Sequence, residues 1–296
     1  MSKINIIIDN DSGIDDSFAI TLAAASSKIN YICTISSWGN SNIEQDTFND
    51  NCFLTANNLT DHTIYRGSAT DILGNPPLTD GYFGKDNKCD IDLKTSKDIK
   101  IINDENLFKS WDEIQKHKDI QYVVLGPCTN LFKLIKIAGK KLWDHITQVI
   151  IMGGNLHSKG NTPGGGEYNF ASDIPAVEQV LNACSPTLVT WDIAEKLAIT
   201  KQEIQKWKTK SIHGNFFIKI CKGFYDYKKH DLVHLCDGLC ILDLLYDYKK
   251  TKINNLGLNL ENGKLIENGG NYSITYVDKF DVSKMYKDLK EVLKID

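Results

Sequence analysis

The alternation of short β-branched runs with helix-type segments is the feature that most constrains the fold of this chain. Five runs have the length and composition of buried strands: Ile4–Ile8, Tyr31–Ser36, Gln121–Leu125, Gln148–Met152 and Thr187–Trp191. Four helix-type segments lie between them: Ser17–Ala25, Glu44–Leu59, Leu131–Ile137 and Ala176–Asn182. Because parallel strands need crossover connections, this order predicts an α/β fold with an open, mostly parallel sheet and helices on both faces.

The last third of the chain is expected to be more helical. Its predicted elements are four helices and one short strand: Gln202–Lys208, Ile212–Tyr227, Leu239–Tyr248, Ser283–Leu293 and the strand Tyr272–Val277. No linker, repeat or low-complexity tract divides the 296 residues. We therefore expect one domain over residues 1–296.

Composition excludes several classes of protein. An apolar content of 42% is too high for wholesale disorder, and a net charge of −4 with a single arginine, Arg66, argues against a nucleic-acid polymer as partner. No apolar run is long enough to span a membrane, and the apolar stretch of the N-terminal MSKINIII is too short for a signal peptide. The eight cysteines include no C-x-x-C pair, so we expect reduced thiols in a cytoplasmic protein, and no zinc site.

Polar residues follow the predicted strands at their carboxyl ends. They form the segments Asp9–Asp16, Gly39-Asn40, Leu125–Pro127 and Met152–Asn155, and the last is followed by Asn161 and Glu167–Asn169. Ligands of open parallel sheets bind at this edge. We therefore expect these carboxylates and amides to converge on one site.

The loop Asp9–Asp16 carries four carboxylates in eight residues, which repel one another unless a cation lies among them. Oxygen ligands without nearby His or Cys favour Ca²⁺ or Mg²⁺ over Zn²⁺. An EF-hand is excluded, because Gly13 is the fifth residue of the loop, no Glu occupies the twelfth position, and a strand precedes the loop. The alternative is a solvated turn whose Asp15 and Asp16 favour the N-terminus of the next helix.

These residues resemble the calcium-dependent nucleoside hydrolases. The segment Asp9–Asp16 (DNDSGIDD) is similar to the family's D-x-D-P-G-x-D-D signature. Five further segments resemble family motifs in the same order: Trp38–Asn40, Leu125–Asn130 (LGPCTN), Met152–Gly154 (MGG), Gly160-Asn161 with Glu167–Asn169, and Trp191-Asp192, after which Cys236-Asp237 falls where the family has a last aspartate opening a helix. The resemblance implies an N-ribohydrolase, in which a ribonucleoside and water give ribose and free base.

The resemblance also implies a role for each matching residue. The side chains of Asp11, Asp16 and Asp237 and the backbone carbonyl of Leu125 are expected to hold Ca²⁺, with Asp11 as the general base that activates water. The remaining residues are expected to bind the ribose: Asp15, Asn40 and Asn169 at the 2′- and 3′-hydroxyls, Asn161 and Glu167 at the 5′-hydroxyl, and Met152 along the sugar, with Asp9 in support. A departing base leaves an oxocarbenium-like sugar, and anionic groups near the ring stabilise that charge. Members of the family are often homodimers or homotetramers.

Two positions depart from the family pattern. Ser12 replaces the proline of the signature, and a serine can cap the turn through its side chain. Cys236 stands where relatives carry the His or Trp that assists the leaving base, and an ordinary thiol is a poor proton donor to a base nitrogen. The remaining suppliers of that proton are His234, His230, the Tyr82 hydroxyl or water.

Two other functions compete with hydrolysis. A relative that retained the metal and lost the chemistry would bind ribonucleosides without cleaving them. A phosphotransferase would use Asp9 as nucleophile and Asp11 as acid and base, because a strand ending in D-x-D suggests that chemistry. The second alternative leaves Asp15, Asp16 and Asn40 without a role.

Overall fold

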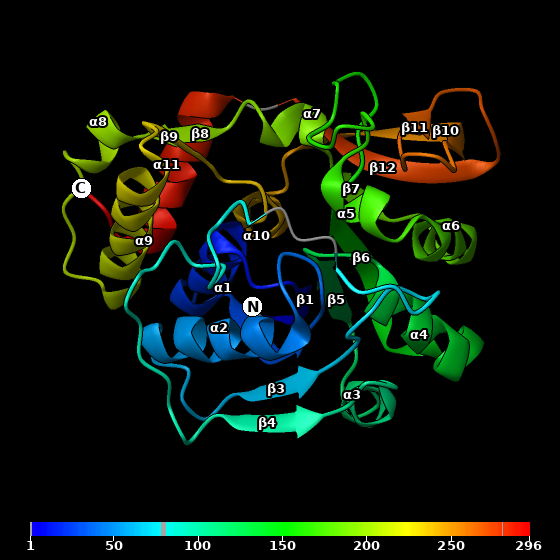
Figure 1. Cartoon of the computed structure of the whole chain (residues 1–296), viewed down its shortest axis with the longest axis horizontal. Helices are drawn as coiled ribbons and strands as arrows, with labels where there is room; N and C mark the ends of the chain where they lie inside the picture. The colour runs from blue at the N-terminus through cyan, green and yellow to red at the C-terminus, as the bar shows by residue number, and fades with distance from the viewer. Residues whose placement is uncertain (1, 78–80, 280) are drawn as a thin grey trace.

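A ten-stranded sheet runs through the computed structural model, which describes residues 2–77, 81–279 and 281–296 (Figure 1). In spatial order its strands are β11 (Leu265–Ile266), β10 (Lys249–Leu258), β12 (Tyr272–Lys279), β7 (Thr187–Val189), β6 (Ile146–Met152), β5 (Ile120–Val124), β1 (Ile4–Asn10), β2 (Ile29–Ser36), β3 (Thr63–Arg66) and β4 (Lys100–Asn103). All strands from β12 to β4 pair in parallel, whereas β10 is antiparallel to β12 and to β11. The predicted α/β fold with a mostly parallel sheet is confirmed.

Helices cover both faces of the sheet because its central strands are apolar on both sides. In β1, Ile6 and Ile8 belong to one core and Ile7 to the other, as the alternation of a strand requires. The first core contains residues of α1 (Ile14–Ala25), α2 (Ile43–Ala56), α9 (Ile212–Lys228), α10 (Gly238–Tyr246) and α11 (Val282–Leu293). The second contains residues of α3 (Phe108–Ile114), α4 (Thr129–Ala138), the 3₁₀ helix η1 (Gly139–Asp144) and α6 (Ile174–Ala183).

The remaining elements are short. They are α5 (Tyr168–Ser172), α7 (Trp191–Ala194), α8 (Lys201–Ile204) and the antiparallel pair β8 (Ala198–Thr200) and β9 (Leu232–His234). Among the described residues, no helix has both the length and the apolar character that a bilayer crossing needs.

The structure contains elements that were not predicted, among them the helices α3, α5 and η1. Six strands were not predicted: β3, β4, β8, β9, β10 and β11. Five of them have only two to four residues, whereas β10 has ten but carries mainly exposed or half-buried polar side chains. The strand predicted to end at Trp191 ends at Val189, and Trp191 begins α7. The helix predicted over Gln202–Lys208 is a single turn that ends at Ile204.

Candidate active site

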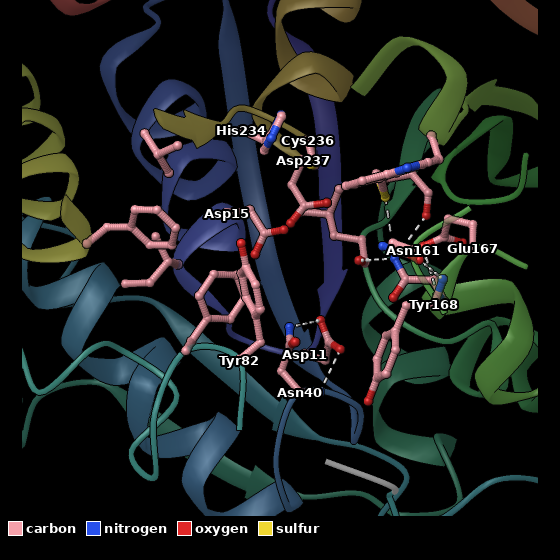
Figure 2. Close-up of a pocket in the computed structure, with 18 residues that line it drawn as sticks. Asp11, Asp15, Asn40, Tyr82, Asn161, Glu167, Tyr168, His234, Cys236 and Asp237 are labelled. Atoms are coloured by element: carbon pink, nitrogen blue, oxygen red, sulfur yellow. Dashed lines mark hydrogen bonds between the residues drawn. The ribbon is translucent and has the colours of Figure 1, made fainter. Parts of the chain in front are cut away.

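A cavity of about 270 Å³ opens at the carboxyl edge of the central strands (Figure 2). Every site residue expected from the sequence lines it except Asp16, which lies directly behind the lining: Asp11, Asp15, Asn40, Leu125, Met152, Asn161, Glu167, Asn169 and Asp237. These residues come from six separate segments of the chain. The parallel topology therefore gathers them at one edge, as the strand order predicted.

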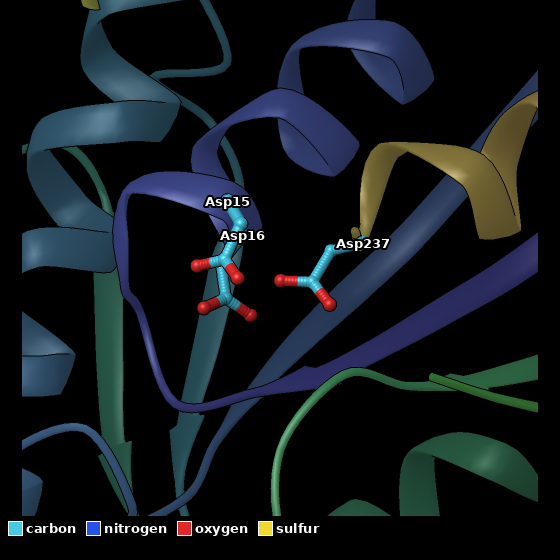
Figure 3. A group of neighbouring side chains, drawn as sticks. All are labelled: Asp15, Asp16 and Asp237. Atoms are coloured by element: carbon cyan, nitrogen blue, oxygen red, sulfur yellow. The ribbon is translucent and has the colours of Figure 1, made fainter. Parts of the chain in front are cut away.

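Three carboxylates meet at one side of the cavity (Figure 3). One oxygen each of Asp15, Asp16 and Asp237 lies within 4.8 Å of the others. Asp15 and Asp16 are in the first turn of α1, and Asp237 is the residue before α10. In the described part of the chain, one buried oxygen of each carboxylate has no hydrogen-bond partner.

Burial and mutual repulsion disfavour the ionised form of this cluster. Burial raises the pKa of Asp15 to about 6. Burial, followed by the charges of neighbouring carboxylates, raises the pKa of Asp11, Asp16 and Asp237 well above the ordinary value. Unpartnered, buried oxygens that repel one another fit a hard cation, which would stabilise the charged forms of all these groups.

The Asp11 carboxylate is held by the loop that follows β2. It accepts hydrogen bonds from the Asn40 backbone N–H at 2.8 Å and from Asn40 Nδ2 at 3.0 Å. A Cβ at Gly39 would lie 2.0 Å from Asp11 Oδ2, so only glycine permits this approach. Asn40, expected at the ribose, therefore orients Asp11 in this structure.

Asn169 and Leu125 are joined directly. Asn169 Nδ2 donates to the carbonyl oxygen of Leu125 at 2.8 Å and to that of Met152 at 3.1 Å. A carbonyl oxygen has two lone pairs, so the Leu125 carbonyl retains one for a further partner. The expected ligand carbonyl and the expected ribose-binding amide thus lie in direct contact.

Glu167 fixes the backbone at one end of the cavity. It is the N-cap of α5, where its carboxylate accepts hydrogen bonds from the backbone N–H groups of Asn169, Phe170 and Gly154 at 2.9, 3.1 and 2.8 Å. Burial raises the pKa of Glu167, although these three hydrogen bonds lower it in part. Asn161 Oδ1 accepts from the Tyr168 N–H at 2.7 Å, which leaves the amide Nδ2 as a donor.

Aromatic side chains form the opposite wall. The rings of Tyr82 and Phe83 pack edge to face at 4.9 Å, and Phe224 of α9 lies 6.2 Å from Phe83. Lys228 Nζ lies 3.8 Å from the centre of the Tyr82 ring and donates to the Tyr82 carbonyl at 2.8 Å. Phe224 was not predicted to line the site, because its helical spacing is equally typical of core packing.

Two of the groups proposed as proton donors to the base differ in position. His234 lines the cavity, whereas His230 is exposed and contacts the backbone of Leu232. Burial lowers the pKa of His234, and its Nδ1 is buried without a hydrogen-bond partner in the described structure. The Cys236 thiol also lines the cavity, but burial and then the nearby carboxylates raise its pKa well above the ordinary value.

Sequence reasoning missed the role of Tyr168 and the position of Trp191. The Tyr168 hydroxyl donates to the Gly39 carbonyl at 3.0 Å, which joins the start of α5 to the loop that holds Asp11. Trp191 lines the cavity, and its ring lies 6.0 Å from that of His234. Tyr168 lies inside the expected Glu167–Asn169 segment, so its place in that motif was the sequence feature that could have indicated a role at the site.

Asp9 lies below the cavity and does not line it. It is 1% exposed, and its carboxylate accepts from the Tyr122 hydroxyl at 2.9 Å and from Asn130 Nδ2 at 2.8 Å. Burial raises the pKa of Asp9 to about 7. Asp9 therefore supports the strand end and is not placed to act as a nucleophile.

One cavity thus combines a buried carboxylate cluster, amide donors and an aromatic wall. This combination suits an α/β enzyme that acts on a small polyhydroxylated molecule with a planar ring. The family described as inosine-uridine preferring nucleoside hydrolase matches residues 6–287. The chain belongs to this family, and it is a hydrolase that splits ribonucleosides into ribose and free base.

Individual relatives agree with this assignment. Uridine nucleosidase 1 of Arabidopsis thaliana is 25% identical over 225 residues, which are 75% of this chain and 67% of the relative. The pyrimidine-specific ribonucleoside hydrolase RihA of Escherichia coli is 27% identical over 206 residues, 69% of this chain and 65% of RihA. The chain thus matches about two thirds of the length of these relatives.

Solved structures share the fold. A plant nucleoside hydrolase superposes with a TM-score of 0.86 at 20% identity, covering 98% of both chains. An inosine-guanosine nucleoside hydrolase superposes with a TM-score of 0.84 at 20% identity, covering both chains fully.

Proposed function

We propose that this enzyme cleaves the N-glycosidic bond with a calcium ion and with Asp11 as general base. The observation that carries the proposal is the group of buried carboxylates with raised pKa and unpartnered oxygens at the cavity wall. Asp11, Asp16, Asp237 and the Leu125 carbonyl would hold the ion. Asp15 would be a further ligand, because one of its oxygens lies within 4.8 Å of oxygens of Asp16 and Asp237, a group that does not include Asp11. The chemistry that Ca²⁺ supplies there is polarisation of water and orientation of vicinal hydroxyls.

The protein's own residues would then act on the sugar. Asp11, oriented by two hydrogen bonds from Asn40, would take a proton from the attacking water. The carboxylates on the same side stabilise the positive charge that develops on the ribose ring as the base departs. We propose that Asp15, Asn40 and Asn169 bind the 2′- and 3′-hydroxyls, beside Met152.

The 5′-hydroxyl would lie at the end of the cavity that Glu167 organises. We propose that Asn161 Nδ2 donates to it, because Asn161 Oδ1 is already taken by the Tyr168 N–H. Glu167 would position the backbone there, since its carboxylate accepts hydrogen bonds from three backbone N–H groups. The base would stack against Tyr82, Phe83 and Phe224.

The decisive test is a reducing-sugar assay on uridine, cytidine, inosine, adenosine and guanosine, with calcium and after chelation. We expect release of ribose that requires calcium, and the names of the curated relatives make uridine the first substrate to test. Nucleoside binding without release of sugar would identify a non-catalytic binder. Phosphate release from a phosphorylated substrate would support the phosphotransferase, which the placement of Asp9 below the cavity disfavours.

Three wider expectations accompany the proposal. We propose that residues 1–296 act as one domain, because the ten-stranded sheet takes strands from the first and last parts of the chain. The eight free cysteines, seven of them buried, suit a reducing compartment such as the cytoplasm. A homodimer or homotetramer is expected from the family, and light scattering after size-exclusion chromatography measures it.

A further inference from the structure

The late β10–β11 hairpin contacts a segment that carries a proposed ribose-binding residue. We call Asn259–Lys264 the hairpin tip and Ser158–Gly166 the flap. In Figure 1 the hairpin, in orange, lies on the same side of the molecule as α5 and α7. Sequence analysis gave the hairpin tip no role, because nearly one hundred residues separate it from the flap.

Three hydrogen bonds within the flap converge on the Gly166 carbonyl. The Gly166 carbonyl accepts from the N–H groups of Asn161 and Thr162 at 3.2 and 3.1 Å, and from the Thr162 hydroxyl at 2.8 Å. Asn155 Nδ2 donates to the Ser158 and Gly165 carbonyls at 2.9 and 3.1 Å. The position of Gly166 therefore sets the position of Asn161.

Two hydrogen bonds run from the hairpin tip to the flap, and a third joins the adjacent Leu265 to Asn155, which precedes the flap. Asn262 Nδ2 donates to the Gly164 carbonyl at 3.0 Å, while Asn262 Oδ1 accepts from the Lys264 N–H at 3.0 Å. Lys264 Nζ donates to the Ser158 carbonyl at 3.3 Å, and the Leu265 N–H donates to the Asn155 carbonyl at 3.0 Å. Because both ends of the Asn262 amide are bonded, its orientation is set.

Two glycines let the backbones approach closely. A Cβ at Gly166 would lie 1.7 Å from the Asn262 carbonyl oxygen. A Cβ at Gly263, whose φ is +76°, would lie 2.9 Å from the backbone of Phe170 in α5. The hairpin tip is therefore packed against both the flap and the helix that carries Asn169.

We propose that the hairpin tip is a positioning element that sets selectivity for the 5′-hydroxyl of the ribonucleoside, with Asn262 and Gly166 as its main contacts. The inference rests on the proposed role of Asn161 at that hydroxyl. The hairpin tip does not touch substrate. It holds the flap at the distance from α5 that directs the Asn161 amide into the cavity.

The first experiment compares two alanine substitutions in the flap. Gly166→Ala places a methyl group against the Asn262 carbonyl, whereas at Gly164 a Cβ meets only Asn262 Cβ at 3.6 Å, an ordinary contact. We expect Gly166→Ala to lower kcat/KM for a ribonucleoside about tenfold or more and to leave kcat/KM for its 5′-deoxy analogue within about twofold. Gly164→Ala should match the wild type on both substrates.

A loss that is equal for the two substrates would overturn the proposal, because it would indicate general damage to the site. Wild-type values of kcat/KM for both substrates in Gly166→Ala would overturn it as well. Asn262→Asp and Asn262→Ala cover the case in which Gly166→Ala does not fold, since both remove the donor to Gly164 and leave the backbone free of new contacts. Leu260→Ala, at a side chain 65% exposed in the same hairpin tip, is the control.

Hydrogen exchange separates failure of this inference from failure of the proposed function. We expect faster amide exchange over residues 158–166 in Asn262→Ala than in Leu260→Ala, with the exchange of β1 and β5 unchanged. If the wild type hydrolyses no nucleoside, this readout still tests the contact, and equal exchange in the two variants would refute it.

Discussion

Asp50→Asn tests whether the buried carboxyl group of Asp50 is protonated in the folded protein near neutral pH. Asp50 lies in α2, is 0% exposed, and accepts a hydrogen bond from Ser36 Oγ. Burial raises its pKa from 3.8 to about 7, although hydrogen bonds from Ser36, Ser12 and Asn10 lower it in part. The folded protein therefore binds a proton between these pH values that the unfolded chain releases.

The sign and size of the effect follow from this difference. A carboxyl group whose pKa is higher in the folded state makes its full contribution to the free energy of unfolding below pH 4. That contribution is lost as the pH rises through 7. One pKa unit is worth about 1.4 kcal/mol, so the loss attributable to Asp50 is about 4 kcal/mol. Asparagine does not titrate, so the free energy of unfolding of the variant relative to wild type should rise by about 4 kcal/mol between pH 4 and pH 8.

Urea unfolding followed by tryptophan fluorescence at several pH values measures this quantity. Each series is run with calcium and with chelator, because ion binding also stabilises the folded state. Asp112→Asn, at an exposed carboxylate in α3, is the matched control and should parallel the wild type. Parallel pH profiles for Asp50→Asn and the wild type would refute the reasoning, because they would mean that Asp50 is ionised in the folded protein.

Three further predictions concern catalysis. Asp11→Asn should lower kcat on the order of 10²-fold or more with a smaller effect on KM, because it removes the base; steady-state kinetics within a few-fold of wild type would assign the base elsewhere. Chelation should abolish turnover and lower Tm, with both restored by calcium; a Tm that calcium leaves unchanged would argue against a site at Asp16 and Asp237. Cys236→Ala should retain activity within about tenfold, whereas His234→Ala should cost more on uridine than on nitrophenyl riboside, whose leaving group needs little protonation. A Cys236→Ala variant inactive on uridine but normal on nitrophenyl riboside would instead make the thiol the acid.

The sequence by itself determined the fold class and which strand-end residues share one edge, whereas Asp237 was assigned to the site only by the family resemblance. Apolar β-branched runs such as Ile4–Ile8, separated by helix-type segments, indicate a parallel sheet covered by helices on both faces. Once the strands are parallel, the segments after them share one edge, and Asp11, Asn40 and Asn169 converge there. These conclusions need only local composition and chain order. The edge strands were not predicted because strands such as β4 are short and exposed. Their strand conformation depends mainly on pairing with neighbouring strands, which their own residues do not indicate.

Only the tertiary structure decided which residues hold one another. Asn40 bonds to Asp11, Asn169 bonds to Leu125, and the Glu167 carboxylate is taken up by backbone N–H groups. No local pattern encodes these partners, because each contact joins segments that are far apart in the chain or depends on the direction of a side chain. The contact between Asn262 and the flap has the same origin: close approach of two distant backbones requires glycine at Gly166, and its partner is visible only in three dimensions.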